Sequence, residues 1–140
     1  MRIMGLDIGD RTIGVALSDP LGWTAQSLTT IRRSHTEEDL AALSKLVQEY
    51  EVGRIVVGLP LSLNGTWGPQ AQKVKEFVHK LGKILAVPVV LWDERLTTAA
   101  AERILLEADL SRRRRKGIVD RLAAALILQS YLDCHRSDGV

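Results

Sequence analysis

The composition is that of a small protein with a substantial core. The chain has 140 residues and a mass of 15.5 kDa, 46% of its residues are hydrophobic, and its net charge is +2. This length suits one domain, expected over residues 1–140, and leaves little room for two. No apolar run approaches the roughly 20 residues of a membrane span, and the first residues enter a predicted strand at once. We therefore expect a cytoplasmic protein, and the single cysteine excludes an internal disulfide.

The first predicted element is a β-hairpin that contains a carboxylate. Two runs with alternating apolar residues, Arg2–Ile8 and Thr12–Leu17, flank a Gly-Asp turn, which is typical of antiparallel strands. Asp7 lies near the end of the first strand, between two apolar residues. A carboxylate there costs free energy unless a metal ion, a hydrogen-bond network or a basic partner compensates its charge. Taken alone, Asp7 is better explained as a residue that terminates the strand, so a metal interpretation depends on the rest of the chain.

The middle of the chain alternates between strands and helices. Thr36 is predicted to cap the first helix, because three acidic residues follow it. The turn-rich segment 60–69 follows a strand, where open α/β sheets tend to bind ligands. The elements predict an α/β fold in which a mixed sheet, an antiparallel meander of three strands plus two parallel strands, is flanked by helices. They are a strand within Gly22–Ile31, a helix over about Glu37–Tyr50, a strand at Arg54–Pro60, a helix over about Pro69–Leu85 and a strand at Val89–Trp92.

Two further helices are predicted in the C-terminal third, separated by a basic tract. They begin at Thr97 or Thr98 and at about Ile118, and end near Leu110 and Cys134. The tract alone carries +5, so the rest of the chain is net negative. Such a run is usually a solvated segment, but it is also the electrostatic footprint of a surface that binds phosphate backbones. The basic tract consists of Arg112, Arg113, Arg114, Arg115 and Lys116.

Three acidic residues form a candidate site: Asp7, Glu94 after the last strand, and Asp120 on the final helix. They converge if the first and last strands lie near each other in the sheet and the final helix packs across them. Carboxylates gathered in one cleft repel one another unless divalent cations neutralise them, and Mg²⁺ or Mn²⁺ suits an all-oxygen site. The arrangement therefore predicts metal-assisted cleavage of phosphodiester bonds. The competing interpretation of Asp120 is a first-turn carboxylate that the helix dipole favours.

Five ordered segments together resemble the bacterial YqgF family, whose members are described both as Holliday-junction resolvase homologues and as pre-16S ribosomal RNA nucleases. The resemblance implies an RNase H-like fold with a five-stranded mixed sheet, and divalent-metal nuclease chemistry. It matches Asp7, Glu94 and Asp120 to the acidic positions of the family, whereas Ser62 stands where the pattern has Asn. The segments are Asp7–Asp19, Val57–Pro60, Asn64-Gly65 with Gly68–Ala71, Trp92–Thr98, and Val119-Asp120 with Ala123-Ala124 and Ile127–Gln129.

The resemblance implies a nuclease for structured or precursor RNA that processes the 5′ end of pre-16S rRNA during ribosome biogenesis. We expect Asp7, Glu94 and Asp120 to hold the metal and the basic tract to hold the substrate backbone. Arg11 and Arg95 either contact phosphate or neutralise neighbouring acids. Adjacent carboxylates on an extended strand point to opposite faces, so only one of residues 93 and 94 binds metal. We favour Glu94, which leaves the other to pair with Arg95, Arg11 or a backbone amide.

Three other functions are compatible with the sequence. A Holliday-junction resolvase in DNA recombination and repair needs the same site presented by a dimer, whereas we expect a monomer or a weak homodimer. The acids are structural if the chain is a non-catalytic RNA-binding or ribosome-assembly module. The hairpin also resembles the phosphate-binding hairpin of actin and sugar kinases, although those proteins clamp nucleotide between two domains. Nothing in the residues themselves selects RNA over DNA.

Overall fold

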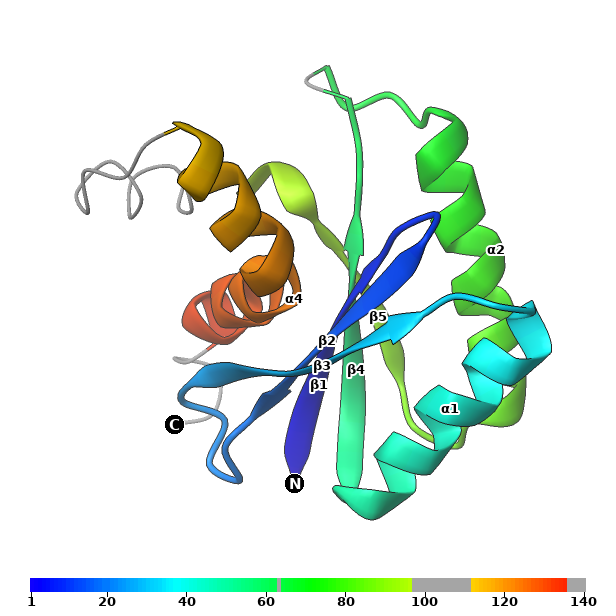
Figure 1. The fold of residues 1–140 in the computed structure, drawn as a ribbon. Helices are drawn as coiled ribbons and strands as arrows, with labels where there is room; N and C mark the ends of the chain where they lie inside the picture. Colours follow the sequence, from blue (N-terminus) through cyan, green and yellow to red (C-terminus); the bar gives the residue numbers. More distant parts are fainter. Residues whose placement is uncertain (63, 97–111, 136–140) are drawn as a thin grey trace.

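A five-stranded mixed sheet forms the centre of the molecule (Figure 1). The computed structural model describes residues 1–62, 64–96 and 112–135, and for residues 112–121 it describes the helical backbone alone. The strand order is β3-β2-β1-β4-β5, with β1, β2 and β3 antiparallel and β4 and β5 parallel to β1. The number of strands and the combination of an antiparallel meander with two parallel strands are as predicted. Its strands are β1 (Arg2–Ile8), β2 (Thr12–Ser18), β3 (Ala25–Arg32), β4 (Val52–Leu59) and β5 (Val89–Asp93).

Helices cover both faces of the sheet. Figure 1 shows α1 (Thr36–Glu49) and α2 (Pro69–Ile84) on one side and α4 (Arg112–His135) on the other. The predicted helix between Thr97 and Leu110 lies outside the described residues. Within the described ranges, no helix is both long enough and apolar enough to cross a membrane.

Strand β1 supplies different residues to the two layers, because successive side chains point to opposite faces. Met4, Leu6 and Ile8 are buried in the large core under α1 and α2. The opposite face presents Gly5 and Asp7 to α4. A Cβ atom at Gly5 would lie 2.7 Å from Leu128 Cβ and 2.9 Å from a helix carbonyl oxygen. Helix α4 therefore sits directly on β1, at a distance that only glycine allows.

The C-terminal half of α4 packs against the sheet through aromatic side chains. Trp92 on β5 packs edge-on against Tyr131, with ring centroids 5.5 Å apart, and its Nε1 donates a hydrogen bond to Ser130 Oγ at 3.1 Å. Ala124, Ile127 and the residues around them are buried in the same layer. This packing fixes which face of α4 meets the sheet.

Two predicted helix boundaries are wrong. Helix α4 begins at Arg112, not near Ile118, so the basic tract is helical. Arginine and lysine are good helix formers, so the helix extends through the tract although Gly117 costs roughly 1 kcal/mol relative to alanine. Asp120 consequently lies more than two turns into α4, beyond the reach of the helix dipole. Helix α1 begins at Thr36 itself, so His35 and not Thr36 is the N-cap residue.

Candidate active site

Asp7 lies on the face of the sheet that α4 covers. It pairs with Gly14 on β2, and its side chain is partly buried. A Cβ atom at Gly14 would lie 3.5 Å from Ala124 Cβ and 3.7 Å from Asp7 Cβ. The missing side chain at Gly14 therefore leaves space between the Asp7 carboxylate and the helix.

Glu94 reaches the same place from the other side of β4. It follows β5 directly, and a Cβ atom at Gly58 would lie 2.5 Å from Glu94 Oε1 and 2.5 Å from Ile127 Cδ1. Since Leu6 pairs with Val57, Gly58 stands on β4 at the level of Asp7. The Glu94 side chain thus lies against Gly58 on β4, the strand between β1 and β5, where there is no side chain to exclude it.

The carboxyl groups of Asp7 and Glu94 interact directly. Burial, the negative charge of Asp7 and a hydrogen bond between the two side chains raise the pKa of Glu94 from its ordinary 4.5 to about 7, and the charge of Asp93 adds to the effect. Two predicted site residues that are distant in the sequence therefore share one partly buried position. Like charges held this close favour the protonated state of one carboxyl group unless a cation is present.

Asp93 and Arg95 form a pair beside this position. The Arg95 guanidinium donates to both Asp93 oxygens, with Nε–Oδ1 at 3.1 Å and Nη2–Oδ2 at 2.6 Å. The Arg95 backbone N–H also donates to Oδ1, at 2.9 Å. The Arg95 guanidinium, through these hydrogen bonds, holds the pKa of Asp93 below its usual range. Of the partners that the sequence left open for Asp93, the structure has Arg95 and a backbone amide.

The third acidic residue, Asp120, belongs to α4, but its side chain is among those that the structure does not describe, as are the side chains of the basic tract. Ala124 and Ile127, four and seven residues further along, are buried beside Gly14 and Gly58. Within the described part of the chain, no three histidine, cysteine or acidic residues lie close enough together to hold a metal ion.

Arg11 is exposed in the β1–β2 turn, and sequence reasoning missed the residues that hold this turn in place. Arg33 donates from its backbone N–H to the Arg11 carbonyl at 2.8 Å and from Nη1 to the Gly9 carbonyl at 3.0 Å. Its Nε donates to Oδ2 of Asp39 at 3.2 Å, and Asp39 is only 2% exposed. In the sequence, Asp39 is one of three acidic residues in a predicted first turn, which indicates neither that it is buried nor that Arg33 is its partner.

The donor atoms near Asp7 suit a hard divalent cation. Both carboxyl groups offer only oxygen ligands, which Mg²⁺ and Mn²⁺ prefer. A bound cation would also stabilise the ionised form of Glu94, whose pKa is raised by burial and by the charge of Asp7. The glycines at 14 and 58 keep side chains away from the two groups. The residues present therefore fit such an ion.

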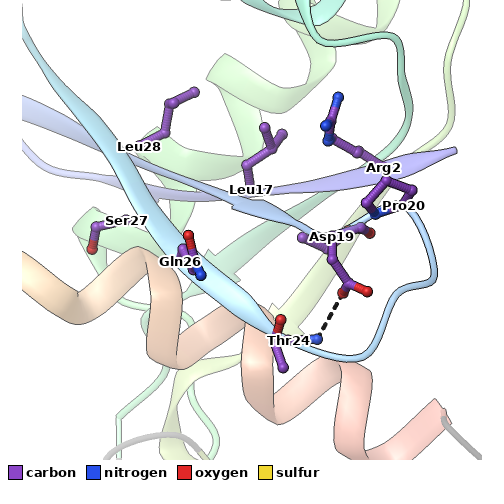
Figure 2. A pocket seen from close by; sticks show the side chains of 9 residues that line it. Arg2, Leu17, Asp19, Pro20, Thr24, Gln26, Ser27 and Leu28 are labelled. Carbon is purple, nitrogen blue, oxygen red and sulfur yellow. Dashed lines mark hydrogen bonds between the residues drawn. The ribbon is translucent and has the colours of Figure 1, made fainter.

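A separate hollow of about 300 Å³ lies at the far end of β1 from Asp7 (Figure 2). Its lining includes Arg2 at the start of β1, Leu28 on β3 and the β2–β3 loop. The carboxylate of Asp19 there accepts hydrogen bonds from the backbone N–H groups of Trp23 at 2.7 Å and Thr24 at 2.8 Å. These bonds lower the pKa of Asp19, with Thr24 the main cause. Asp19 therefore holds a turn, and this hollow is distinct from the carboxylate pair.

Comparison with known proteins agrees with this geometry. A model of the RuvX family, described as a Holliday junction resolvase, matches residues 1–134. The chain belongs to the RuvX family. Relatives from Moorella thermoacetica, 61% identical over the whole of both chains, and Thermoanaerobacter pseudethanolicus, 56% identical over 98% of this chain and 99% of the relative, are each named "putative pre-16S rRNA nuclease". RuvX membership places the chain among the nucleases, which are hydrolases of phosphodiester bonds.

The fold comparison points the same way. The structure of Thermus thermophilus RuvC in complex with a Holliday junction substrate aligns with a TM-score of 0.65, at 14% identity, over 99% of this chain and 96% of RuvC. A second structure of Thermus thermophilus RuvC aligns with a TM-score of 0.59. At this identity the likeness shows the fold alone. It confirms the predicted RNase H-like architecture of the RuvX chain.

Proposed function

We propose that this chain is a divalent-metal-dependent nuclease that processes the 5′ end of the 16S ribosomal RNA precursor. The observation that carries the proposal is the pair of interacting carboxyl groups of Asp7 and Glu94, brought together across Gly58 in a member of a nuclease family. The choice of RNA rests on the names of relatives that are 56–61% identical over nearly the whole chain. That substrate also implies a cytoplasmic protein.

Asp7, Glu94 and Asp120 are the proposed ligands of Mg²⁺ or Mn²⁺. Asp120 is assigned from helical spacing, because residues four and seven positions apart share a helix face with it, and those residues are Ala124 and Ile127, which pack beside the carboxyl pair. The bound ion supplies electrophilic stabilisation of the charge that develops on the phosphate. The protein itself contributes the position of the carboxylates and a partly buried setting in which that charge is poorly screened.

Arg11, Arg95 and the basic tract are the proposed contacts of the substrate backbone. Arg11 is exposed at the turn that follows Asp7, and Arg95 is oriented by Asp93 immediately after Glu94. The five residues of the tract span more than one turn of α4, so they surround the helix axis and do not line one face. We therefore expect unequal contributions from Arg112, Arg113, Arg114, Arg115 and Lys116 to RNA binding.

A Holliday-junction resolvase is the second candidate, because the RuvX family is described as a Holliday junction resolvase. Resolution of a junction needs two sites that act on opposing strands, so it requires a dimer in solution. We propose a monomer or a weak homodimer for the RNA nuclease. Solution mass together with a branched DNA substrate separates the two candidates.

The test incubates purified protein with labelled precursor 16S rRNA and, in parallel, with a four-way DNA junction, in Mg²⁺, in Mn²⁺ or in EDTA. Asp7→Asn is compared with Asp133→Asn, which removes the same charge from an exposed position near the end of α4. We expect cleavage of the RNA with either metal, none in EDTA, and loss of cleavage in Asp7→Asn alone.

Each other outcome contradicts a stated part of the proposal. If Asp7→Asn still cleaves the RNA, Asp7 is not part of the catalytic site and the carboxylate site is wrong. Cutting of the junction and not of the RNA favours the resolvase. RNA that binds without being cut under any condition makes the chain a binding module with structural acids.

A further inference from the structure

The outward face of α2 carries a row of basic side chains that the proposed site does not use. Three lysines and a histidine recur at helical spacing and are exposed. A shallow groove of about 550 Å³ runs along them. Only one acidic residue, Glu76, lines the groove, so its net charge is positive. The lining residues are Gln72, Lys75, Glu76, His79, Lys80 and Lys83.

The opposite face of α2 explains why this row points outward. Ala71, Val74, Phe77 and Leu81 are buried against the sheet, which fixes the rotation of the helix. Lysines 75 and 83 are then separated by about 12 Å along the helix axis. That length spans roughly three or four stacked nucleotides at about 3.4 Å each.

The groove is connected to the carboxyl pair through the loop after β4. The Arg95 guanidinium lies against this loop, since a Cβ atom at Gly65 would be 3.4 Å from Arg95 Nη1. The loop is held by hydrogen bonds that the Ser62 hydroxyl makes with Asn64 and Thr66. Basic and polar groups therefore continue from Glu94 toward the start of α2.

An exposed aromatic ring stands where the loop meets the groove. Trp67 is 44% exposed, and Lys75 Nζ lies 5.6 Å from its ring centroid. A large exposed aromatic beside lysines is the combination by which proteins bind single-stranded nucleic acid, with the ring stacking on a base and the lysines contacting phosphates. An acidic protein partner would account for the lysines but not for the exposed ring, so single-stranded nucleic acid is the better match.

We propose that the α2 groove and Trp67 bind single-stranded RNA that extends from the cleavage site, with Lys75, Lys80 and Lys83 on its phosphates and Trp67 stacked on an unpaired base. This proposal rests on the proposed function, because the RNA is the substrate of that same site. It places one arm of the substrate on the opposite side of the sheet from the basic tract.

Binding is measured in EDTA, so that cleavage plays no part, with a labelled oligouridylate about 20 nucleotides long, across a KCl series. Replacing Lys75, Lys80 and Lys83 together by glutamine should reduce the slope of log K against log[salt] by about 2, because each lost single-strand contact removes about 0.7. Lys45→Gln, at an exposed position on α1, is the matched control and should leave the slope unchanged. Glu76→Gln should tighten binding, because it removes the one acid of the groove.

Trp67 is tested separately. Trp67→Ala should weaken binding about tenfold with little change in the salt slope, and Trp67→Phe should restore most of the affinity, because phenylalanine keeps a ring for stacking. The same salt slope in the triple variant and the unaltered protein overturns the groove, and equal affinity in Trp67→Ala overturns the stacking.

The two proposals fail in different ways. If the unaltered protein cuts precursor rRNA but the triple variant has the same salt slope, the proposed nuclease is supported and the proposed groove is wrong. If the triple variant has a smaller salt slope but the unaltered protein does not cut RNA, the proposed groove is supported and the proposed nuclease is wrong. No binding of the oligouridylate by the unaltered protein overturns the groove.

Discussion

The raised pKa of Glu94 makes the stability of the metal-free protein depend on pH. Its carboxyl group titrates near 7 in the folded chain against 4.5 ordinarily, owing to burial and to Asp7. The protonated form is therefore favoured by folding. This stabilisation is fully present below about pH 4.5 and is lost as the pH rises through about 7.

The size of the loss follows from the shift. At 1.36 kcal/mol per pKa unit, the free energy of unfolding falls on the order of 3 kcal/mol between about pH 4.5 and 8. Urea unfolding in EDTA, followed by tryptophan fluorescence, measures it. Other groups also titrate in this range, so the decisive quantity is the difference between the unaltered protein and Glu94→Gln, which cannot ionise. We expect the variant to have the flatter pH profile.

Addition of the ion should offset part of this loss. At about pH 8, Mg²⁺ or Mn²⁺ at ten times its Kd should stabilise the unaltered protein by about 1.4 kcal/mol, since only the folded chain offers the site. Glu94→Gln should gain less at the same concentration. Parallel pH profiles for the two proteins would refute the carboxyl pair, and equal stabilisation of both by the ion would refute Glu94 as a ligand.

Three further substitutions separate effects on the site from effects on the fold. Gly58→Ala places a Cβ atom 2.5 Å from both Glu94 Oε1 and Ile127 Cδ1, which are the ends of side chains and can shift. Cleavage should therefore fall at least about tenfold, while the free energy of unfolding in urea falls by about 1–2 kcal/mol, because Ile127 is part of the core. Gly5→Ala meets backbone of α4 at 2.9 Å, which cannot move aside, and should cost about 3 kcal/mol in the same unfolding assay; a near-neutral result would mean that α4 does not sit this close to β1. Asp39→Ala leaves Arg33 without its buried partner and should destabilise the protein by about 3 kcal/mol, whereas a loss below about 1 kcal/mol would make that ion pair marginal.

Local pattern was sufficient for most of the sheet. Alternating apolar residues predicted β1 and β2, and the resemblance to the YqgF family implied a five-stranded mixed sheet, whereas the order of the strands came from the structure. Local pattern failed where two local explanations compete. The basic tract was interpreted as a solvated segment before a helix that begins near Ile118, and its inclusion in α4 changed the position of Asp120 within the helix.

The sequence by itself determined which residues are candidates: Asp7 and Glu94 stand out because each is a carboxylate beside a predicted buried strand. Only the tertiary structure decided that they meet. Their approach depends on β4 lying between β1 and β5 and on Gly58 having no side chain to separate them. The partner of Asp39 was likewise decided by tertiary structure, because Arg33 joins it to the Gly9 turn. Such contacts are set by the packing of distant elements, and spacing along a chain does not encode which strands become neighbours.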